Sequence, residues 1–404
     1  MDSNPVISFE NTENAFAYKS DKELRLAHFL FSSMSYQFLV KLGTSFTPWM
    51  IKIGLPIKGL IRQTIFKQFV GGETLQETAN VAKKLASYHV KTILDYGVEG
   101  KEGEENYDHA CEEFINVINY ASTQPEILCM SVKVTGFCRH TLLEKLHLQC
   151  DNANAVNGIV NLDSLDEVEK AEWKRFEQRV DRVCAMGFEK GVKVLIDAEE
   201  SWIQNPVDAM TMAMMEKYNK NSAVVFNTIQ LYRTDRLQFL KDSFEKALQK
   251  NFFLGEKLVR GAYMEKERKR ADEYNYPSPI QPDKESCDND FDASVEFCIS
   301  HLEKISVVVA SHNEKSNLYT VELMNKKGIN INHPHVHFSQ LYGMSDNITF
   351  NLAKAGCVVS KYLPFGPIED VIPYLMRRAQ ENSSVAGQTG RELGLIKKEL
   401  QRRK

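Results

Sequence analysis

The sequence lacks the short motifs that mark the common nucleotide-binding sites. No GxGxxG segment leads from a strand into a helix, and neither GxxxxGKS nor GxxxxGKT occurs, so no Rossmann dinucleotide site or P-loop is indicated. The eight cysteines are scattered without CxxC spacing, and we interpret them as reduced, cytoplasmic thiols. A nucleotide cofactor would therefore need a site built from loop amides and cations instead.

The chain also lacks an excess of positive charge and a long apolar run. Its 50 Lys and Arg against 54 Asp and Glu leave a formal net charge of −4, which argues against a nucleic-acid-binding protein. The N-terminal MDSNPVISFENTEN is acidic and polar, unlike a signal peptide. In the most apolar region, 27–70, the residues Lys41, Pro48, Lys52 and Lys58 interrupt the run before ~20 apolar residues, so no transmembrane helix is predicted. We expect helices packed on the main domain, with an amphipathic membrane-contact patch as the alternative.

What the sequence does contain is a repeated alternation of β-rich runs and longer helical patterns. A chain of 404 residues could form one large barrel or two to three ordinary domains. Eight strands followed by helices predict the α/β class and a (βα)8 TIM barrel. The predicted strands are residues 91–97, 127–136, 192–200, 223–230, 252–263, 306–313, 335–343 and 358–366. We expect an N-terminal helical region over 1–85 and the barrel over 86–404, with a helical insertion at about 139–190.

Each predicted strand carries a polar or charged residue near its C-terminal end. Barrel enzymes place their chemistry at that end, so these side chains are the first candidates for a site. Any one of them could instead form a turn or cap a helix. They are Asp95, Lys133, Asp197, Gln230, Lys257, His312, Gln340 and Tyr362.

The histidine-rich HPHVH segment at 333–337 suggests a different chemistry. Alternate residues of a strand face the same way, so its imidazoles could converge on one metal ion. These histidines enter the seventh strand at its N-terminal end, however, and a catalytic metal is expected at the opposite end. A metal-dependent barrel hydrolase is thus the second hypothesis for function, and a non-catalytic barrel-shaped binding protein is the third.

Residues 361–384 predict a strand, a Gly-Pro turn and a helix with one apolar face. On a helical wheel, Arg377 projects opposite that face, together with Tyr374, and Arg378 lies at its flank. Paired arginines on a helix usually point to water, but two adjacent guanidinium groups can also bind one carboxylate. In KLVRGAYMEKER, Gly261 and Ala262 permit close backbone approach to a ligand, or merely form a tight barrel corner.

These two segments resemble the signature motifs of the proline dehydrogenase family. Tyr-x-Pro-x-Gly-Pro begins at Tyr362 and is followed by the Arg-Arg pair and Glu-Asn, with fifteen residues from Tyr362 to Arg377. Further similar segments occur in family order from about residue 90 to 390: LDYGVE, SVKVTG, IDAEE, NTIQ, ASHN and QLYGM. The resemblance implies a distorted barrel whose last helix lies over the barrel mouth. It also implies a monofunctional, FAD-dependent enzyme of the eukaryotic-like branch.

The resemblance implies a role for each matched residue. Catalytic roles fall to Asp197, Lys257 and Tyr362, with Asp197 orienting Tyr362 and Lys257 near flavin N5, although long bifunctional bacterial members have Arg at that position. Glu99 is implied as a gate that pairs with a substrate arginine when the site is empty, and no metal ligand is implied. The implied substrate-binding residues are Lys133, Leu258, Tyr263, Tyr362, Arg377 and Arg378. The implied flavin-binding residues are Ala198, Gln230, Lys257, Val259, Arg260, Gly261, Ala262, Ser311, His312, Asn313, Gln340 and Glu381.

The implied reaction oxidises L-proline to Δ1-pyrroline-5-carboxylate, with FAD as the hydride acceptor and a membrane quinone as the final electron acceptor. A separate pyrroline-5-carboxylate dehydrogenase would consume the product. The protein is expected to be cytoplasmic, with peripheral contact at the inner face of a membrane. In the family, the tyrosine at position 362 packs against the substrate ring where a 4-hydroxyl would project, so trans-4-hydroxy-L-proline should be excluded.

Overall fold

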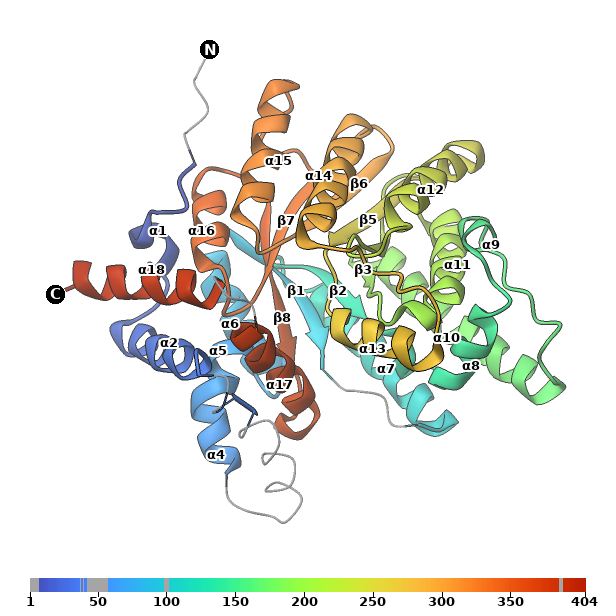
Figure 1. Ribbon diagram of the computed structural model, residues 1–404, viewed down its shortest axis with the longest axis horizontal. Helices are drawn as coiled ribbons and strands as arrows, with labels where there is room; N and C mark the ends of the chain where they lie inside the picture. Colours follow the sequence, from blue (N-terminus) through green and yellow to red (C-terminus); the bar gives the residue numbers. More distant parts are fainter. Residues whose placement is uncertain (1–6, 37, 39, 42–56, 98–101, 385–387) are drawn as a thin grey trace. The chain divides into compact units, whose positions relative to one another are not determined.

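Eight parallel strands form one closed barrel in the computed structural model, which describes residues 7–36, 38, 40, 41, 57–97, 102–384 and 388–404. The strands follow chain order around the barrel and alternate with helices, which confirms the predicted (βα)8 fold (Figure 1). They are β1 (Val90–Tyr96), β2 (Ile127–Val132), β3 (Lys193–Ile196), β4 (Val225–Gln230), β5 (Leu254–Val259), β6 (Ile305–Ala310), β7 (Val336–Leu341) and β8 (Val359–Phe365).

Every observed strand overlaps a predicted one, but all the predicted C-terminal ends except that of 223–230 extend too far. The segment 192–200 was predicted as a single strand, whereas β3 ends at Ile196. The segment 252–263 likewise exceeds β5, which ends at Val259. The extra residues lie in the loops, beyond the regular ladder pairing of the strands. A local pattern of extended residues cannot indicate where that pairing stops.

Contacts divide the chain into two compact units, residues 1–99 with 339–404 and residues 100–338. The predicted boundary at residue 85 stays a prediction, as does the predicted insertion, although α8, α9 and α10 fall within 139–190. In the second unit the helices are α7 (Glu104–Ala121), η2 (Val134–Gly136), α8 (His140–His147), α9 (Asn152–Val156), α10 (Glu167–Lys190), α11 (Ser201–Tyr218), α12 (Arg236–Lys250), α13 (Met264–Tyr274), α14 (Lys284–Ser300) and α15 (Glu314–Lys326).

Helix α10 shows how the local sequence sets these elements. Asp166 caps its N-terminus and forms a capping box with Glu169, and Gly191 ends it in the left-handed conformation at φ 68°. Trp173 and Phe176 lie on its buried face. Other helices of this unit, α11 and α14, lie against β4 and β6 and cover the outside of those strands (Figure 1). As a result all six residues of β4 are buried.

The first unit contains β1 and β8, which pair in parallel, and the helices from both ends of the chain. These helices are α1 (Thr12–Phe16), α2 (Asp21–Met34), α4 (Lys58–Ile61), η1 (Arg62–Phe66), α5 (Lys67–Phe69), α6 (Leu75–Ala86), α16 (Asp346–Lys354), α17 (Ile368–Ser384) and α18 (Gln388–Arg402). An apolar cluster that includes Phe31, Phe69, Val371 and Ile396 joins α2, α5, α17 and α18. Within the described ranges, no helix is long and apolar enough to cross a membrane.

Helix α17 matches its predicted apolar face except at one residue. Ile368, Val371 and Leu375 are buried, as expected from their helical spacing. Tyr374, predicted to lie on the opposite, exposed side, is buried in the same apolar cluster, so that prediction was wrong. The reason is that α2 and η1 pack against α17 as well, and a helical wheel cannot show a second neighbour. Val371 approaches Gly97, so α17 lies beside the C-terminal end of β1; its predicted place over the barrel mouth stays a prediction.

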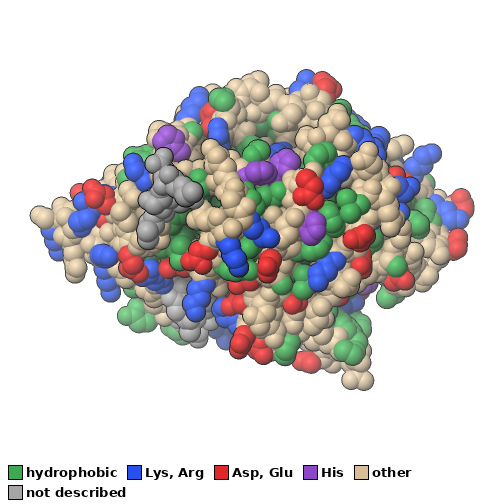
Figure 2. All heavy atoms as spheres, turned by 90° about the horizontal axis from the view of Figure 1, so that it is seen from above, with side chains coloured by type: hydrophobic (Ala, Val, Ile, Leu, Met, Phe, Trp, Pro, Cys, Tyr) green, Lys and Arg blue, Asp and Glu red, His purple; other side chains and the backbone are tan. Residues whose placement is uncertain are grey.

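The surface bears charges of both signs. On the face drawn in Figure 2, Lys and Arg side chains alternate with Asp and Glu, and no large area of a single sign forms. This distribution agrees with the nearly balanced composition of the chain. On the face that is drawn, no basic footprint of the kind that nucleic-acid binding requires is seen (Figure 2).

Candidate active site

A cluster of three charged side chains lies at the ends of β2, β3 and β5. The ammonium group of Lys257, which is 5% exposed, forms an ion pair with the carboxylate of Asp197, which is 8% exposed. Lys133 Nζ lies 3.8 Å from Asp197 Oδ2. Burial alone would raise the pKa of Asp197, but the two ammonium groups outweigh burial and lower that pKa to about 2. The cluster therefore carries a net positive charge and suits an anionic or electron-rich ligand.

The sequence places each of these three residues at a predicted strand end, but it does not single out two residues beside them. Thr135 Oγ1 donates to the carboxylate of Glu199, at 2.8 Å from Oε1 and 3.1 Å from Oε2. Glu199 belongs to the IDAEE segment in which only Asp197 and Ala198 had been singled out. The missing signal is the pairing of the loops after β2 and β3, which the spacing within one motif does not contain.

Gln230 ends β4 and is oriented by a hydrogen bond to the main chain. Its Nε2 donates to the carbonyl oxygen of Glu199 at 2.9 Å. Its Oε1 is buried and has no hydrogen-bond partner among the residues that the structure describes. A buried acceptor without a partner costs roughly 1–3 kcal/mol, which a ligand N–H group would offset. This atom fits the predicted role of Gln230 at a flavin.

Arg260 connects the end of β5 with the loop after β6. Its guanidinium donates to Ser311 Oγ at 2.7 Å and to Ser316 Oγ at 2.9 Å, and pairs with Asp288 at 2.7 Å. Ser316 lies in the first turn of α15, whose N-terminus Asn313 caps. A cation beside a helix N-terminus suits a phosphate group. The predicted flavin residues Arg260, Ser311 and Asn313 are thus gathered at one place.

Gly261 is required by its surroundings. Its φ of 136° is unfavourable for other residues, and a Cβ atom there would lie 2.4 Å from the ring of Tyr232. The exposed backbone at Gly261 and Ala262 then leads to the half-buried Tyr263 and into α13. Leu258 is fully buried and follows Lys257 within β5, so the two side chains lie on opposite faces of the strand. The predicted contact of Leu258 with a substrate stays a prediction.

The remaining predicted residues lie in the first unit. Arg378 is 7% exposed and donates to Glu381 Oε1 at 2.6 Å, while Arg377 is half-buried. Burial raises the pKa of Glu381, and the two arginines oppose that rise. Arg378 therefore does not point into solvent, and its Nε is buried without a hydrogen-bond partner in the described part of the chain. An anionic ligand could satisfy that donor.

Strands β7 and β8 carry two further predicted residues of this unit. Gln340 Oε1 accepts a hydrogen bond from Thr349 Oγ1 at 2.8 Å. Tyr362 is half-buried on β8, and its carbonyl oxygen accepts from the Tyr342 N–H at 2.9 Å. The hydrogen bond predicted between Asp197 and Tyr362 stays a prediction. Glu99, the predicted gate, lies outside the described residues.

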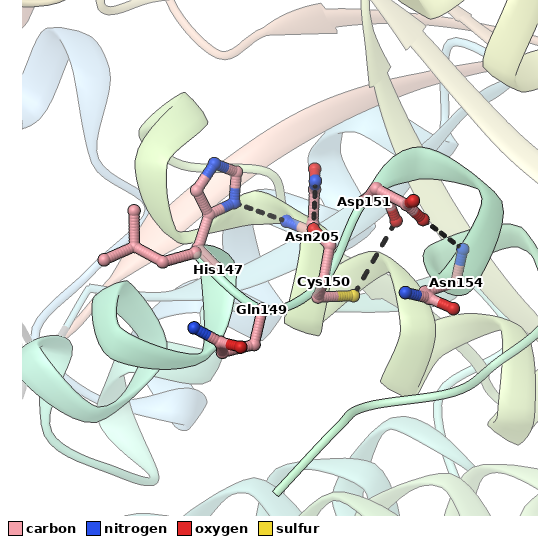
Figure 3. A pocket seen from close by; sticks show the side chains of 7 residues that line it. His147, Gln149, Cys150, Asp151, Asn154 and Asn205 are labelled. Carbon is pink, nitrogen blue, oxygen red and sulfur yellow. Dashed lines mark hydrogen bonds between the residues drawn. The ribbon is translucent and has the colours of Figure 1, made fainter. Parts of the chain in front are cut away.

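A polar pocket also lies among α8, α9 and α11, and contains none of the predicted residues (Figure 3). Its lining includes His147, Cys150, Asp151 and Asn205. His147 Nδ1 accepts from the Asn205 N–H at 3.4 Å, and burial together with three nearby arginines lowers the pKa of His147 to about 4. The imidazole is thus neutral at physiological pH, and the lining contains none of the lysines or arginines that lie at the strand ends.

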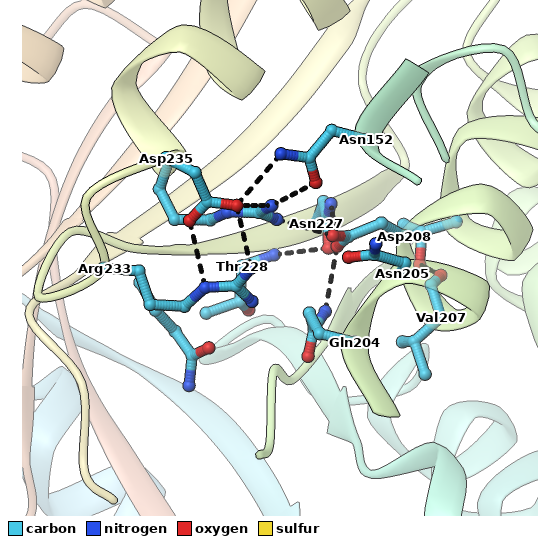
Figure 4. A network of polar contacts seen from close by, with 12 residues as sticks. Asn152, Gln204, Asn205, Val207, Asp208, Asn227, Thr228, Arg233 and Asp235 are labelled. Carbon is cyan, nitrogen blue, oxygen red and sulfur yellow. Dashed lines mark hydrogen bonds and ion pairs between the residues drawn. The ribbon is translucent and has the colours of Figure 1, made fainter. Parts of the chain in front are cut away.

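Next to this pocket is a buried network centred on Asp208 (Figure 4). Its carboxylate accepts from Arg236 at 2.7 Å, from Gln204 at 2.8 Å and from Asn227 at 2.9 Å. These bonds tie α11 to β4 and α12. Since the side chains of Asp208 and Arg236 are almost fully buried and paired with each other, we assign the network to the packing of helices on the barrel.

Comparison with known proteins gives the family. A model of the family described as proline dehydrogenase matches residues 78–391. Proline dehydrogenase 1, mitochondrial, of Dictyostelium discoideum is 32% identical over 426 residues, which cover 97% of this chain and 74% of the relative. This chain belongs to the proline dehydrogenase family. The match confirms the resemblance inferred from the motifs.

Other relatives and structural neighbours carry different names. The carbapenem antibiotics biosynthesis protein CarD of Pectobacterium carotovorum is 32% identical over 335 residues, which cover 83% of this chain and 83% of the relative. A hydroxyproline dehydrogenase of Xenopus laevis is 29% identical, over 96% of this chain and 88% of the relative. Proline utilization A of Bdellovibrio bacteriovorus shares the fold, with a TM-score of 0.69 and 21% identity. The matched part covers 95% of this chain and 40% of that longer protein.

The family match does not favour the metal-dependent hydrolase. Within the described ranges, no group of three His, Cys, Asp or Glu side chains could hold a metal ion. The rings of His333 and His335 pack edge to face with centroids 5.4 Å apart, and burial lowers the pKa of His337 to about 3. These histidines therefore belong to the packing at the start of β7.

Proposed function

We propose that this proline dehydrogenase family member oxidises L-proline to Δ1-pyrroline-5-carboxylate by hydride transfer to FAD. The observation that carries the proposal is the buried cluster of Lys257, Asp197 and Lys133 at the strand ends of a chain in this family. Fixing the reacting carbon over the acceptor makes the transfer effectively unimolecular. FAD supplies the hydride acceptor when bound.

The residues of the second unit fit a flavin nucleotide. Gln230 offers a buried acceptor to a ring N–H group. Arg260, with the N-terminus of α15, offers positive charge to the pyrophosphate. The exposed backbone of Gly261 and Ala262 permits close approach of a planar ring. We propose that Lys257 lies near flavin N5, and that Ala198, Val259, His312, Gln340 and Glu381 complete the cofactor site.

We further propose how the substrate is bound. Arg377 and Arg378 bind the carboxylate, with Lys133 adding positive charge, because a planar guanidinium pair matches the two carboxylate oxygens. Tyr263 and Tyr362 form walls for the pyrrolidine ring. In this proposal Asp197 keeps Lys257 in place by their ion pair and remains ionised.

The fate of the electrons and of the product extends the proposal. We propose a membrane quinone as the electron acceptor and a separate pyrroline-5-carboxylate dehydrogenase as the next enzyme. Relatives from Dictyostelium discoideum and Arabidopsis thaliana carry the word mitochondrial in their names. The cytoplasmic location expected from the sequence stays a prediction, as does peripheral contact with a membrane.

The visible spectrum of the purified protein tests the proposal. We expect flavin absorption bands that bleach anaerobically on addition of L-proline, with D-proline as the matched control that fits the chiral site poorly. The product is measured as the 2-aminobenzaldehyde adduct of the pyrroline. A colourless protein that FAD does not reconstitute, especially one containing stoichiometric zinc, would instead support the hydrolase.

A further inference from the structure

The loops after β2 and β3 form two successive side-chain pairs. The ladder between these strands continues past their ends, since the Asp197 N–H donates to Val132 O at 2.9 Å. Lys133 then faces Asp197 at 3.8 Å, and Thr135 donates to the Glu199 carboxylate at 2.8 Å. Glu199 therefore lies one pair beyond the charged cluster of the candidate active site, on the same loop as Asp197.

Glu199 is also fixed through its backbone. Its carbonyl oxygen accepts from Gln230 Nε2 at 2.9 Å, and its N–H donates to Gln204 Oε1 at 3.2 Å. These bonds leave the position of the side chain defined and its carboxylate half-buried, held by the Thr135 hydroxyl. The carboxylate is thus held in one place beside the charged cluster and remains partly exposed.

The three carboxylates on this loop differ in their proton affinity. Asp197 is ionised because two ammonium groups lower its pKa to about 2. Burial would raise the pKa of Glu200, but hydrogen bonds to His140 and Lys266 lower it to about 2. Burial raises the pKa of Glu199 to about 7, although the hydrogen bond from its hydroxyl partner opposes this rise. Glu199 is thus the member of the three that exchanges its proton near neutral pH.

The proposed reaction requires such a group. The ring nitrogen of proline is a protonated secondary amine at neutral pH, and its electron pair is bound to hydrogen. That pair must be released before it can form the C=N bond while hydride leaves the adjacent carbon. Asp197, held between two cations, is too weak a base for this proton.

We propose that the Glu199 carboxylate accepts the proton that the ring nitrogen of the substrate loses. One N–H bond breaks, an O–H bond forms on Glu199, and the electron pair stays on nitrogen for the C=N bond. The proton then passes from the half-buried Glu199 to water. This inference rests on the proposed function and adds the residue that performs its acid–base step.

The test is the pH dependence of kcat/KM for L-proline in the wild type and in Glu199→Gln. A required base is inactive when protonated, so the wild-type value falls as pH decreases through the pKa of Glu199. In Glu199→Gln this acid limb disappears, and kcat/KM at pH 8 falls by roughly 10²- to 10⁴-fold, as for loss of a general base. The other titratable and charged groups near Glu199, which are unchanged in this variant, are Lys133, Cys138, His140 and Glu200.

A second readout separates proton transfer from structure. Tetrahydrofuran-2-carboxylate has the ring and carboxylate of proline but no N–H to lose. Its Kd, measured by the change in the flavin spectrum, should therefore differ by no more than about threefold between Glu199→Gln and the wild type. This change is far smaller than the expected loss in kcat/KM. Glu200→Gln is the matched control: it removes the neighbouring carboxylate, and the acid limb should remain. A parallel loss of analogue binding and turnover in Glu199→Gln would overturn the proposal, because it would indicate a structural role.

The Thr135 hydroxyl provides an independent test. Thr135→Val removes a hydrogen bond to the ionised carboxylate and should move the acid limb to higher pH, whereas Thr135→Ser should leave it in place. An unchanged limb in Thr135→Val, or a limb retained in Glu199→Gln, would exclude Glu199 as the proton acceptor. If Glu199→Gln fails to fold, the pH profiles of the two Thr135 variants decide whether Glu199 is the proton acceptor. A wild type that L-proline does not reduce would instead contradict the proposed function itself.

Discussion

Two buried clusters of this protein each place one aspartate between two lysines, yet they differ in what surrounds them. Asp197 pairs with Lys257 and Lys133 at the strand ends of the second unit. Asp346, at the start of α16 in the first unit, lies 3.0 Å from Lys361 and 3.5 Å from Lys19. The same charges thus occur once in the candidate active site and once in the interior of the other unit.

The Asp346 cluster is buried on all sides. Lys361 is fully buried and also donates to the carbonyl oxygens of Met344 at 2.5 Å and Leu341 at 3.3 Å, while Tyr18 donates to Asp346 at 2.8 Å. The cluster joins the N-terminal helices to β8 and the loop after β7. In the Asp197 cluster, by contrast, the Lys133 side chain remains 28% exposed. The comparison indicates that access for a ligand, rather than the set of charges, distinguishes the candidate site from a structural tie.

The largest expected effect is on the free energy of unfolding, and it should differ between the structural Asp346 cluster and the Asp197 cluster of the candidate site. Lys361→Met leaves Asp346 buried with a weaker partner and should lower the free energy of unfolding by ~3–5 kcal/mol. Lys133→Met removes a partly exposed charge and should cost less than about 1 kcal/mol, while it strongly impairs turnover of L-proline. Urea unfolding followed by circular dichroism measures the first effect, and steady-state kinetics the second. Equal stability losses in both variants would contradict the distinction.

Arg378 tests whether a buried group can also bind a ligand. Arg377→Met or Arg378→Met should lower kcat/KM for L-proline, since removing one partner of a desolvated charge pair costs ~2–5 kcal/mol. Flavin retention should survive best in Arg377→Met, because Arg378 is the one paired with Glu381, a proposed cofactor residue. Arg403→Met, which removes a structural partner of Glu399 on α18, is the control and should leave the KM for proline unchanged. Near-normal proline kinetics in both arginine variants would place the pair among structural residues.

The sequence predicted those features of the two clusters that depend on the local pattern of residues along the chain. The eight strands were found because apolar alternation and turn residues recur along the chain, and Lys133, Asp197 and Lys257 because each lies at a strand end. The Asp346 cluster was missed, since Lys19 and Lys361 meet it from distant parts of the chain, and a lysine in an alternating strand pattern is normally solvent-facing. Glu199 was missed because its proton affinity depends on burial. Burial is a property of the fold and not of the motif.

Glu392, a buried carboxyl group near Asp346, should make the stability of the protein depend on pH. It lies on α18 near Asp346, accepts a hydrogen bond from the Ser345 N–H, and has its pKa raised to about 7 by burial and by the charge of Asp346. A carboxyl group whose pKa is higher in the folded state stabilises the fold fully below its unfolded pKa. That contribution is lost as pH rises through the folded pKa. Stability should therefore decrease between pH 5 and 8 through this residue.

Glu392→Gln should remove this dependence. The amide oxygen can still accept from Ser345, and no charge has to be buried, so the variant should be more stable than the wild type at pH 8 by about 1–3 kcal/mol. At pH 5 the two proteins should be nearly equal. The measurement is Tm and urea midpoint across this pH range, with the exposed Glu285→Gln as control. A wild type whose stability rises toward pH 8, with Glu392→Gln following it, would contradict the prediction.

The smallest expected effect concerns two neighbouring residues of β8, one in the structural cluster and one in the proposed substrate site. Lys361 is buried in the structural cluster, whereas Tyr362, the next residue, is half-buried and is proposed to contact the substrate ring. Because successive residues of a strand face opposite sides, changes at the two positions should have separate consequences. If Tyr362 packs where a 4-hydroxyl would project, trans-4-hydroxy-L-proline leaves that hydroxyl without a partner, at ~1–3 kcal/mol. The wild type should then prefer L-proline by roughly tenfold to a hundredfold in kcat/KM.

Tyr362→Ser should narrow this preference, since it opens volume and offers a hydroxyl partner, and it should also weaken proline turnover because the ring loses a wall. Tyr362→Phe keeps the wall and should keep the preference. Lys361→Met, measured at a temperature where it is folded, should leave the ratio between the two substrates unchanged while it lowers stability. The hydroxyproline dehydrogenase among the relatives, 29% identical to this chain, makes the ratio informative, since related chains are named for different ring substrates. A wild-type preference for hydroxyproline, or the same ratio in Tyr362→Ser, would mean that Tyr362 does not line the ring.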